Sequence, residues 1–231
     1  MEIEGQSFIV QDTWARISTL SRTYYDIAAD AYELYLDDVE NRIRDPGNDH
    51  DPSEHMAQTE RITIQGIKVI VFSAMALEAA VFDFAAIHLG DEMAKEHLDK
   101  LDLLGKWVIV PQLVCGRALR EDGPAFNNLR SLVKARNRLV HHKSMPYSKS
   151  VLAEVEKRSQ QFRQDVGLAL KTVVLLSLEL EMLIGATVGV LPTFDKEVNA
   201  FNSQPVTRSR VTKAIADCRS IHRKNFDTEK A

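Results

Sequence analysis

Apolar residues recur at intervals of three and four along most of the chain, which is the spacing of one face of an α-helix. From Trp14 to Ile43 this pattern predicts one long helix or two helices in series. Residues 45–55 contain two prolines and a glycine, so we expect a connection there. A second helical block extends from Arg61 to Leu89, and its nearly continuous apolar run indicates a helix surrounded by protein.

The second half of the chain continues the same pattern. Further helices are expected at about 93–104, at 124–142, from Ser148 onward, and at 162–190. Residues 107–116 fit either a short strand or an extended connector halted by Pro111, and we favour the connector. Because no alternating strand pattern or internal repeat is visible, the predicted fold class is all-α, an up-and-down bundle of four to six helices.

The chain of 231 residues is long enough for one large core or two small ones. Its composition, 45% hydrophobic and 27% charged, excludes a wholly disordered or collagen-like protein. We divide it into three segments: an N-terminal long helix or helix pair with an acidic loop (1–60), a helical core (61–192) and a basic C-terminal tail (193–231). The tail is poor in large apolar residues, so we expect a loosely attached helix or a solvated arm.

Charge is distributed unevenly although the formal net charge is only −4. Residues 26–60 contain eleven acids and two arginines, whereas residues 123–143 contain five Lys or Arg, two histidines and no acid. From Gln204 to the end there are seven Lys or Arg and three acids. A local basic surface is therefore expected on a protein that is acidic overall.

Several other functional classes are not expected from the sequence. The longest run without Asp, Glu, Lys or Arg is the 13 residues 182–194, and the first residues have no basic region typical of a secretory signal, so we expect a cytoplasmic protein without membrane contact. Cys115 and Cys218 are far apart and suit unpaired thiols. His50, Asp51, Glu54 and His55 match no established zinc spacing, so no metal site is predicted.

The candidate chemistry lies on the predicted helix 124–142. At 100° per residue, one stripe contains four apolar residues, Leu129, Leu132, Val133 and Val140. Arg136 falls in the middle of this stripe, where a guanidinium must meet a carboxylate, a phosphate or a water-filled cleft between subunits. Glu78, flanked by apolar residues, is the obvious internal partner. A structural ion pair and a functional arginine both stay open.

The adjoining face of this helix carries the second candidate group. Asn137 and His141 are four residues apart and therefore neighbours, with Arg130 and Lys134 one to two turns earlier. His141 and His142 lie near the predicted helix C-terminus, where carbonyl dipoles favour the imidazolium form. The arginine and the histidine together indicate a functional site more specifically than either residue does alone.

The Arg136 and His141 pair, with four residues between them beginning with Asn137, resembles the signature of the HEPN superfamily, whose members bind nucleotides or cut RNA. The resemblance covers roughly residues 65–145: it includes ALEA around Glu78, LLGKW ending at Trp107, and LRSLVKARNRLVHHK. It implies a helical bundle that forms a homodimer, in which the Arg and His of both copies face one composite cleft. It also suggests toxin action or antiphage defence, with an antitoxin as a candidate partner. Lys143 stands where some HEPN toxins carry a tyrosine, so neutralisation through that residue is not expected.

The implied activity is metal-independent RNA cleavage. The 2′-hydroxyl of RNA supplies the nucleophile, two His141 side chains would share the proton transfers, Arg136 would bind the phosphate and Asn137 would orient either group. The expected RNA-binding residues, which attract the phosphate backbone without selecting bases, are Arg130, Lys134, Arg138, His142 and Lys143. No metal or other cofactor is needed for this chemistry. Single-stranded or looped RNA is the expected substrate.

Two other functions stay open from the sequence. In the first, the same cationic cleft belongs to a non-catalytic module that binds a nucleotide, RNA or an acidic partner, because many folds keep the shape of a site without its chemistry. In the second, the chain is a structural dimer without affinity for RNA. RNA cleavage with and without metal, compared with binding that leaves the strand intact, distinguishes these possibilities.

Overall fold

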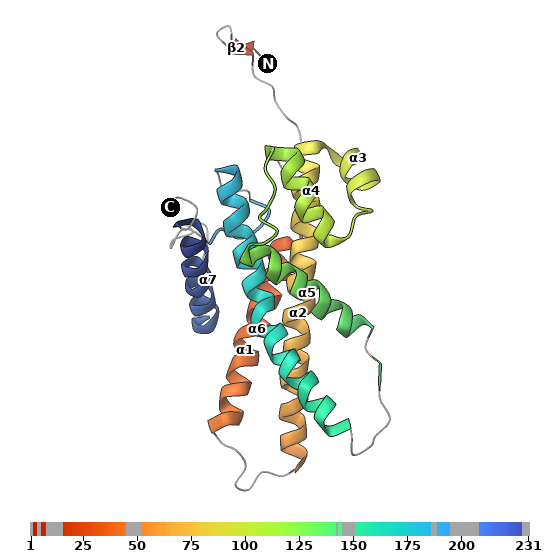
Figure 1. Cartoon of the computed structure of the whole chain (residues 1–231), viewed down its shortest axis with the longest axis vertical. Coiled ribbons are helices and arrows are strands. Elements are labelled where there is room, and N and C mark those ends of the chain that lie inside the picture. Colours follow the sequence, from red (N-terminus) through yellow and green to blue (C-terminus); the bar gives the residue numbers. More distant parts are fainter. Residues whose placement is uncertain are drawn as a thin grey trace.

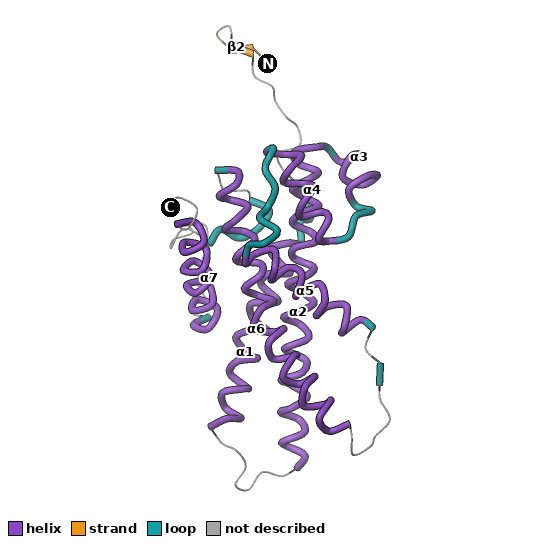
Figure 2. The backbone as a smooth tube through the Cα atoms, viewed as in Figure 1, coloured by secondary structure: helices purple, strands orange, loops and turns teal. Residues whose placement is uncertain are grey.

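The computed structural model describes residues 2–3, 6–7, 16–44, 52–141, 143–144, 151–185, 189–194 and 208–227. These residues are mainly helical, which confirms the all-α fold class; a two-residue antiparallel pair, β1 (Glu2–Ile3) and β2 (Gln6–Ser7), lies at the N-terminus (Figure 2). The helical elements in chain order are α1 (Ser21–Arg44), α2 (Pro52–Leu89), α3 (Asp91–Met93), the π-helical turn η1 (Ala94–Leu98), α4 (Leu103–Cys115), α5 (Pro124–Val140), α6 (Val151–Ile184) and α7 (Ser209–Asp227).

Three long helices, α1, α2 and α6, follow the long axis of the molecule, and α5 crosses α2 and α6 (Figure 1). Helix α2, with 38 residues, packs against α1, α4, α5 and α6. Helices α3 and α4 lie together at one end, and α7 lies on the outer side of α1 and α6. This arrangement leaves the C-terminal end of α5 at the edge of the bundle, on the side away from α1.

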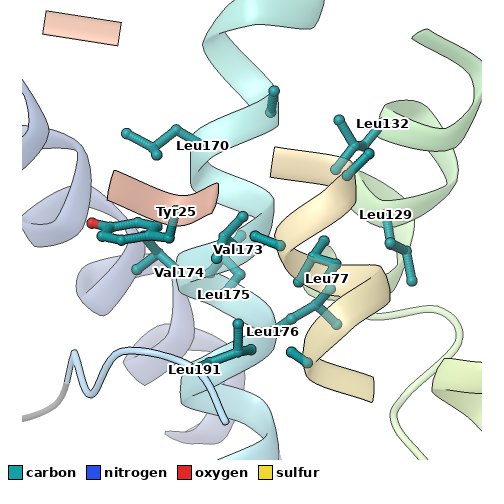
Figure 3. Packing of buried hydrophobic residues seen from close by; sticks show 14 of the residues in the cluster. Tyr25, Leu77, Leu129, Leu132, Leu170, Val173, Val174, Leu175, Leu176 and Leu191 are labelled. Atoms are coloured by element: carbon teal, nitrogen blue, oxygen red, sulfur yellow. The ribbon is translucent and has the colours of Figure 1, made fainter. Parts of the chain in front are cut away.

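The core lies where α2, α5 and α6 meet. Leu77 of α2 packs near Leu129 and Leu132 of α5, and the α6 run from Val173 to Leu176 fills the space between α2 and α1 (Figure 3). All these side chains are buried, and Tyr25 of α1 belongs to the same cluster. Burial of each such side chain contributes about 1.5–3 kcal/mol, so this layer fixes the position of the first half of α5.

The expected connector at residues 107–116 is wrong, because helix α4 spans Leu103–Cys115 with Pro111 inside it. The helix begins at Asp102, whose side chain accepts a hydrogen bond from the Gly105 N–H at 2.7 Å, and it ends at Gly116 with a left-handed φ of 70°. Pro111 lies in the last turn and a half, and it is buried together with Trp107. The apolar face of α4 therefore outweighs the one hydrogen bond that proline removes.

Other boundaries differ less. Helix α2 already begins at Pro52, so the last four residues of the expected connection are helical, while 45–51 lie outside the described residues. Proline suits the first turn of a helix because its missing N–H would have no helical partner there. Helix α6 is continuous from Val151 to Ile184, where the pattern predicted two helices. The tail contains helix α7, which is packed against the bundle.

Helix α2 is also notable for its hydropathy. Among the described helices, the segment Ser53–Leu89 is long and apolar enough to cross a membrane. The central helix of a bundle passes the same test, and 61% of the most apolar window is buried inside the fold. The segment is therefore weak evidence for membrane contact.

Helices α2 and α6 approach each other closely at Gly66. A Cβ atom at this position would lie 2.5 Å from Cζ of Phe162 and 3.0 Å from Cγ2 of Val166. We expect Gly66→Val to lower the free energy of unfolding by about 2 kcal/mol, because the added methyl groups must displace a packed ring. Urea unfolding measures the effect, and Phe162→Leu in the same background should recover part of the loss. Equal losses with and without Phe162→Leu would contradict this contact.

Candidate nucleic-acid interface

Helix α5 carries most of the predicted site residues. It begins after Gly123 with Pro124 at its first position, and its first three turns bury Phe126, Leu129 and Leu132 against the core. The last turns extend past the bundle towards the edge of the molecule (Figure 1). The described charged residues of this half of the helix are therefore presented to solvent.

Arg136 is exposed in this structure, and Nη1 of its guanidinium donates a hydrogen bond to Oδ1 of Asn137 at 3.3 Å. It makes no other hydrogen bond or ion pair with the described part of the chain. Val140, one turn later, is 60% exposed. The apolar stripe predicted from the sequence is thus buried as far as Leu132, whereas Arg136 and Val140, which continue it, are left exposed by the residues that the structure describes.

Glu78 does not pair with Arg136. Its carboxylate instead forms an ion pair with Nζ of Lys106 on α4, and Asp99 binds the same amine at 2.7 Å. Burial lowers the pKa of Lys106, but the hydrogen bonds that its amine donates to Asp99 and Glu78 offset this effect, and the pKa is raised overall. Sequence reasoning missed Lys106, although a single lysine within an apolar run was a signal that it needed a carboxylate.

His141 is the residue at which α5 ends. Its backbone N–H donates to the carbonyl oxygen of Asn137 at 3.0 Å, and its side chain is exposed. Within the described residues no hydrogen bond or ion pair of its imidazole is found. Arg136 and His141 are five residues apart, so their side chains leave the helix in directions that differ by about 140°. One copy of the chain therefore does not direct both groups at the same point.

Two of the predicted RNA-binding residues are already engaged with acids. Arg130 bonds the carboxylate of Glu121 at 3.2 Å, and its guanidinium lies 4.6 Å from the ring centre of Phe126. Arg138 bonds Asp165 of α6 at 2.6 Å, and the carboxylate of Asp165 is 6% exposed. These contacts tie α5 to the preceding loop and to α6, respectively.

The remaining predicted site residues with a basic side chain form what we call the α5 cationic end, made up of Lys134, Arg136, His141 and Lys143. All four side chains are exposed. None of them bonds to a carboxylate in the portions of the chain that the structure describes. His142, also predicted to bind RNA, lies outside the described residues. The cationic end is therefore open to an external anion.

The described residues also contain a small cavity at the opposite end of α5, between Arg120, Pro124, Glu179 and His222. Its volume of about 30 Å³ is comparable to that of one water molecule and is too small for a nucleotide. No group of three or more His, Cys, Asp or Glu side chains suited to a metal ion occurs among the described residues, and both cysteines are unpaired. His50 and Asp51 lie outside that part of the chain.

Comparison with known proteins identifies no related protein. No family model, curated protein or solved structure matches the chain. The function must therefore be argued from the residues of the site and their geometry.

Proposed function

We propose that the chain is an HEPN-like, metal-independent endoribonuclease that acts as a homodimer. The observation that carries this proposal is the α5 cationic end, where an arginine and a histidine are held at the end of a well-packed helix without an acidic partner in the described residues. The phosphate backbone of RNA is an external ligand of matching charge.

A second copy of the chain completes the site in this proposal. Arg136 and His141 of one copy diverge around the helix, so convergence on one phosphate requires groups from two copies. The exposed Val140 offers an apolar contact beside Arg136. Helix α2 carries four further exposed apolar residues at helical spacing, Met56, Ile64, Ile67 and Met75. Burial of such residues against a second copy would supply the hydrophobic contribution that a stable dimer needs.

The proposed reaction uses the 2′-hydroxyl of the RNA. His141 of one copy takes the proton from this hydroxyl, the 2′-oxygen attacks the phosphorus, and the bond to the 5′-oxygen breaks. His141 of the other copy donates a proton to the departing 5′-oxygen. Arg136 binds the non-bridging oxygens, and its hydrogen bond to Asn137 limits the directions that its guanidinium samples. The products are a 2′,3′-cyclic phosphate and a 5′-hydroxyl.

The other cations contribute to binding rather than to the reaction. Lys134 and Lys143 are exposed and attract the phosphates on either side of the cleaved bond. Arg130 and Arg138 contribute less, because Glu121 and Asp165 already offset their charges. Binding is therefore expected to depend on salt and to select weakly among sequences. A toxin or antiphage role would follow from such an activity in a growing cell.

The decisive experiment is cleavage of a single-stranded RNA by the purified full chain in the presence of EDTA. We expect strand breaks that EDTA does not slow, with 2′,3′-cyclic phosphate ends identified by mass spectrometry. A substrate whose 2′-hydroxyl at one position is replaced by hydrogen should resist cleavage there. Cleavage of the all-deoxy strand at the same rate would show that this mechanism is wrong.

The competing function is a non-catalytic module that binds RNA or a nucleotide. It is favoured by one observation: no hydrogen bond from the described residues orients the imidazole of His141, whereas a catalytic base is typically oriented by a third group. Under this alternative the RNA is retarded in a gel-shift assay but stays intact during a long incubation. Retardation should then disappear when Lys134 and Arg136 are both replaced by glutamine.

A further inference from the structure

One face of α1 carries five carboxylates, at spacings of three and four residues. We call this set the acidic ladder: Asp26, Asp30, Glu33, Asp37 and Glu40. Residues at this spacing share one side of a helix, and like charges so placed repel one another. The stripe therefore needs cations from another part of the protein.

These cations come from the beginning of α7. Nη1 of Arg208 lies 3.3 Å from Asp26, and its Nη2 lies 2.7 Å from Asp30. Arg210 contacts the other three carboxylates of the acidic ladder, at distances between 2.9 and 3.3 Å. Two arginines thus bridge all five acids.

Glu33 also caps α7. Its carboxylate accepts hydrogen bonds from the backbone N–H groups of Arg210 at 3.0 Å and Val211 at 3.2 Å, and from the Ser209 hydroxyl at 3.2 Å. The first N–H groups of a helix have no helical partner, and the helix dipole favours a negative charge there. Glu33 of α1 therefore acts as the N-terminal cap of α7, a role that a residue next to the helix in sequence usually has.

The apolar contact of α7 with the bundle is small by comparison. It consists of Val211, Ala214, Cys218 and the half-buried Ile215. Further along α7, Asp217 pairs with Lys171 of α6 at 3.2 Å, and Arg219 donates to the carbonyl oxygen of Phe194. The ion pairs of α7 are partly exposed, and salt screens ion pairs of this kind.

We propose that α7 is a releasable strap, docked on the acidic ladder at low ionic strength and detached as the salt concentration rises, while α1, α2, α5 and α6 stay folded. Release takes the two arginines away from the five carboxylates on α1, most of which are already partly exposed, and so leaves an acidic surface that suits a basic partner segment. This inference does not depend on the proposed function. It concerns the face of the molecule away from the α5 cationic end.

Cys218 reports on the position of α7. Cys218 lies on α7 itself, and its thiol is fully buried between α7 and the bundle. Burial raises its pKa to about 12, so little reactive thiolate is present while α7 is in place. In the full chain with Cys115→Ser, Cys218 is the only thiol. Its rate of labelling by a thiol reagent therefore measures how often α7 detaches.

We expect this rate to increase about tenfold or more between about 0.1 M and about 1 M NaCl, as the Debye length falls from about 10 Å to about 3 Å. The helical circular dichroism and the urea midpoint should change little over the same range. Arg210→Gln should raise the rate at low salt and remove most of its salt dependence.

The matched control is Arg223→Gln, which changes an exposed arginine of α7 that has no ion pair within the described residues. It should label like the parent chain. The proposal would be overturned if the labelling rate did not change with salt concentration. It would also be overturned if the rate increased only in parallel with global unfolding in urea, because α7 would then be an integral part of the core.

Discussion

Replacement of His141 by alanine is expected to reduce RNA cleavage by about 10²–10⁴-fold, the contribution typical of a general acid or base. Both proton transfers of the proposed reaction depend on this side chain, one in each copy. The fold should be unaffected, because the imidazole is exposed and makes no hydrogen bond with the described residues. Single-turnover cleavage of a labelled RNA and the thermal midpoint, measured side by side, test both statements.

His97→Ala is the matched control for this experiment. His97 is also an exposed histidine at a helical position, on η1 at the far end of the molecule. It should cleave like the parent chain. If His141→Ala retained the parent rate, the assignment of the site would be wrong; if it lost cleavage but still bound RNA, the proton-transfer role would be supported.

Val140→Asp is expected to convert the protein to a monomer and to abolish cleavage. In the single chain Val140 is 60% exposed, so an aspartate there is solvated and the free energy of unfolding should change by less than about 0.5 kcal/mol. At the interface with a second copy, the same carboxylate would be desolvated beside its symmetry mate. Sedimentation velocity reports the oligomeric state, and the cleavage assay reports whether one copy suffices.

Leu34→Asp provides the comparison, since Leu34 is 52% exposed and lies on α1 rather than on α2 or α5. It should leave the parent's oligomeric state and activity in place. A dimeric Val140→Asp variant, or an active monomer, would show that the composite site does not form around the end of α5.

The helices of this fold follow well from hydrophobic spacing. Pro124 correctly marked the beginning of α5, and the periodic apolar residues after Arg61 marked α2. The failure at α4 has a physical cause: Pro111 is disruptive in an isolated helix, but its cost falls in the last turns of a helix whose apolar face is buried. Local propensity does not contain that tertiary contribution.

The site was predictable in part. The spacing correctly grouped Leu129 and Leu132 on one face, but it could not show that Arg136 and Val140 are exposed, because the packing of the other helices decides which positions of α5 are covered. Burial of Lys106 beside Glu78 and Asp99 depends on a contact between α2 and α4. Acid-rich and base-rich segments were visible in the sequence, whereas their pairing across more than 160 residues was not.

The separation of charge between α1 and α5 has a consequence for how a polyanion would arrive. The acidic ladder has three more charges than the two arginines that bind it, and it lies across the molecule from Lys134, Arg136 and Lys143. Such an arrangement gives the protein an uneven charge distribution, which would turn the proposed RNA ligand towards one edge before any contact forms. The association rate constant for RNA should therefore be high at low ionic strength, because the RNA would first meet the protein at the α5 cationic end.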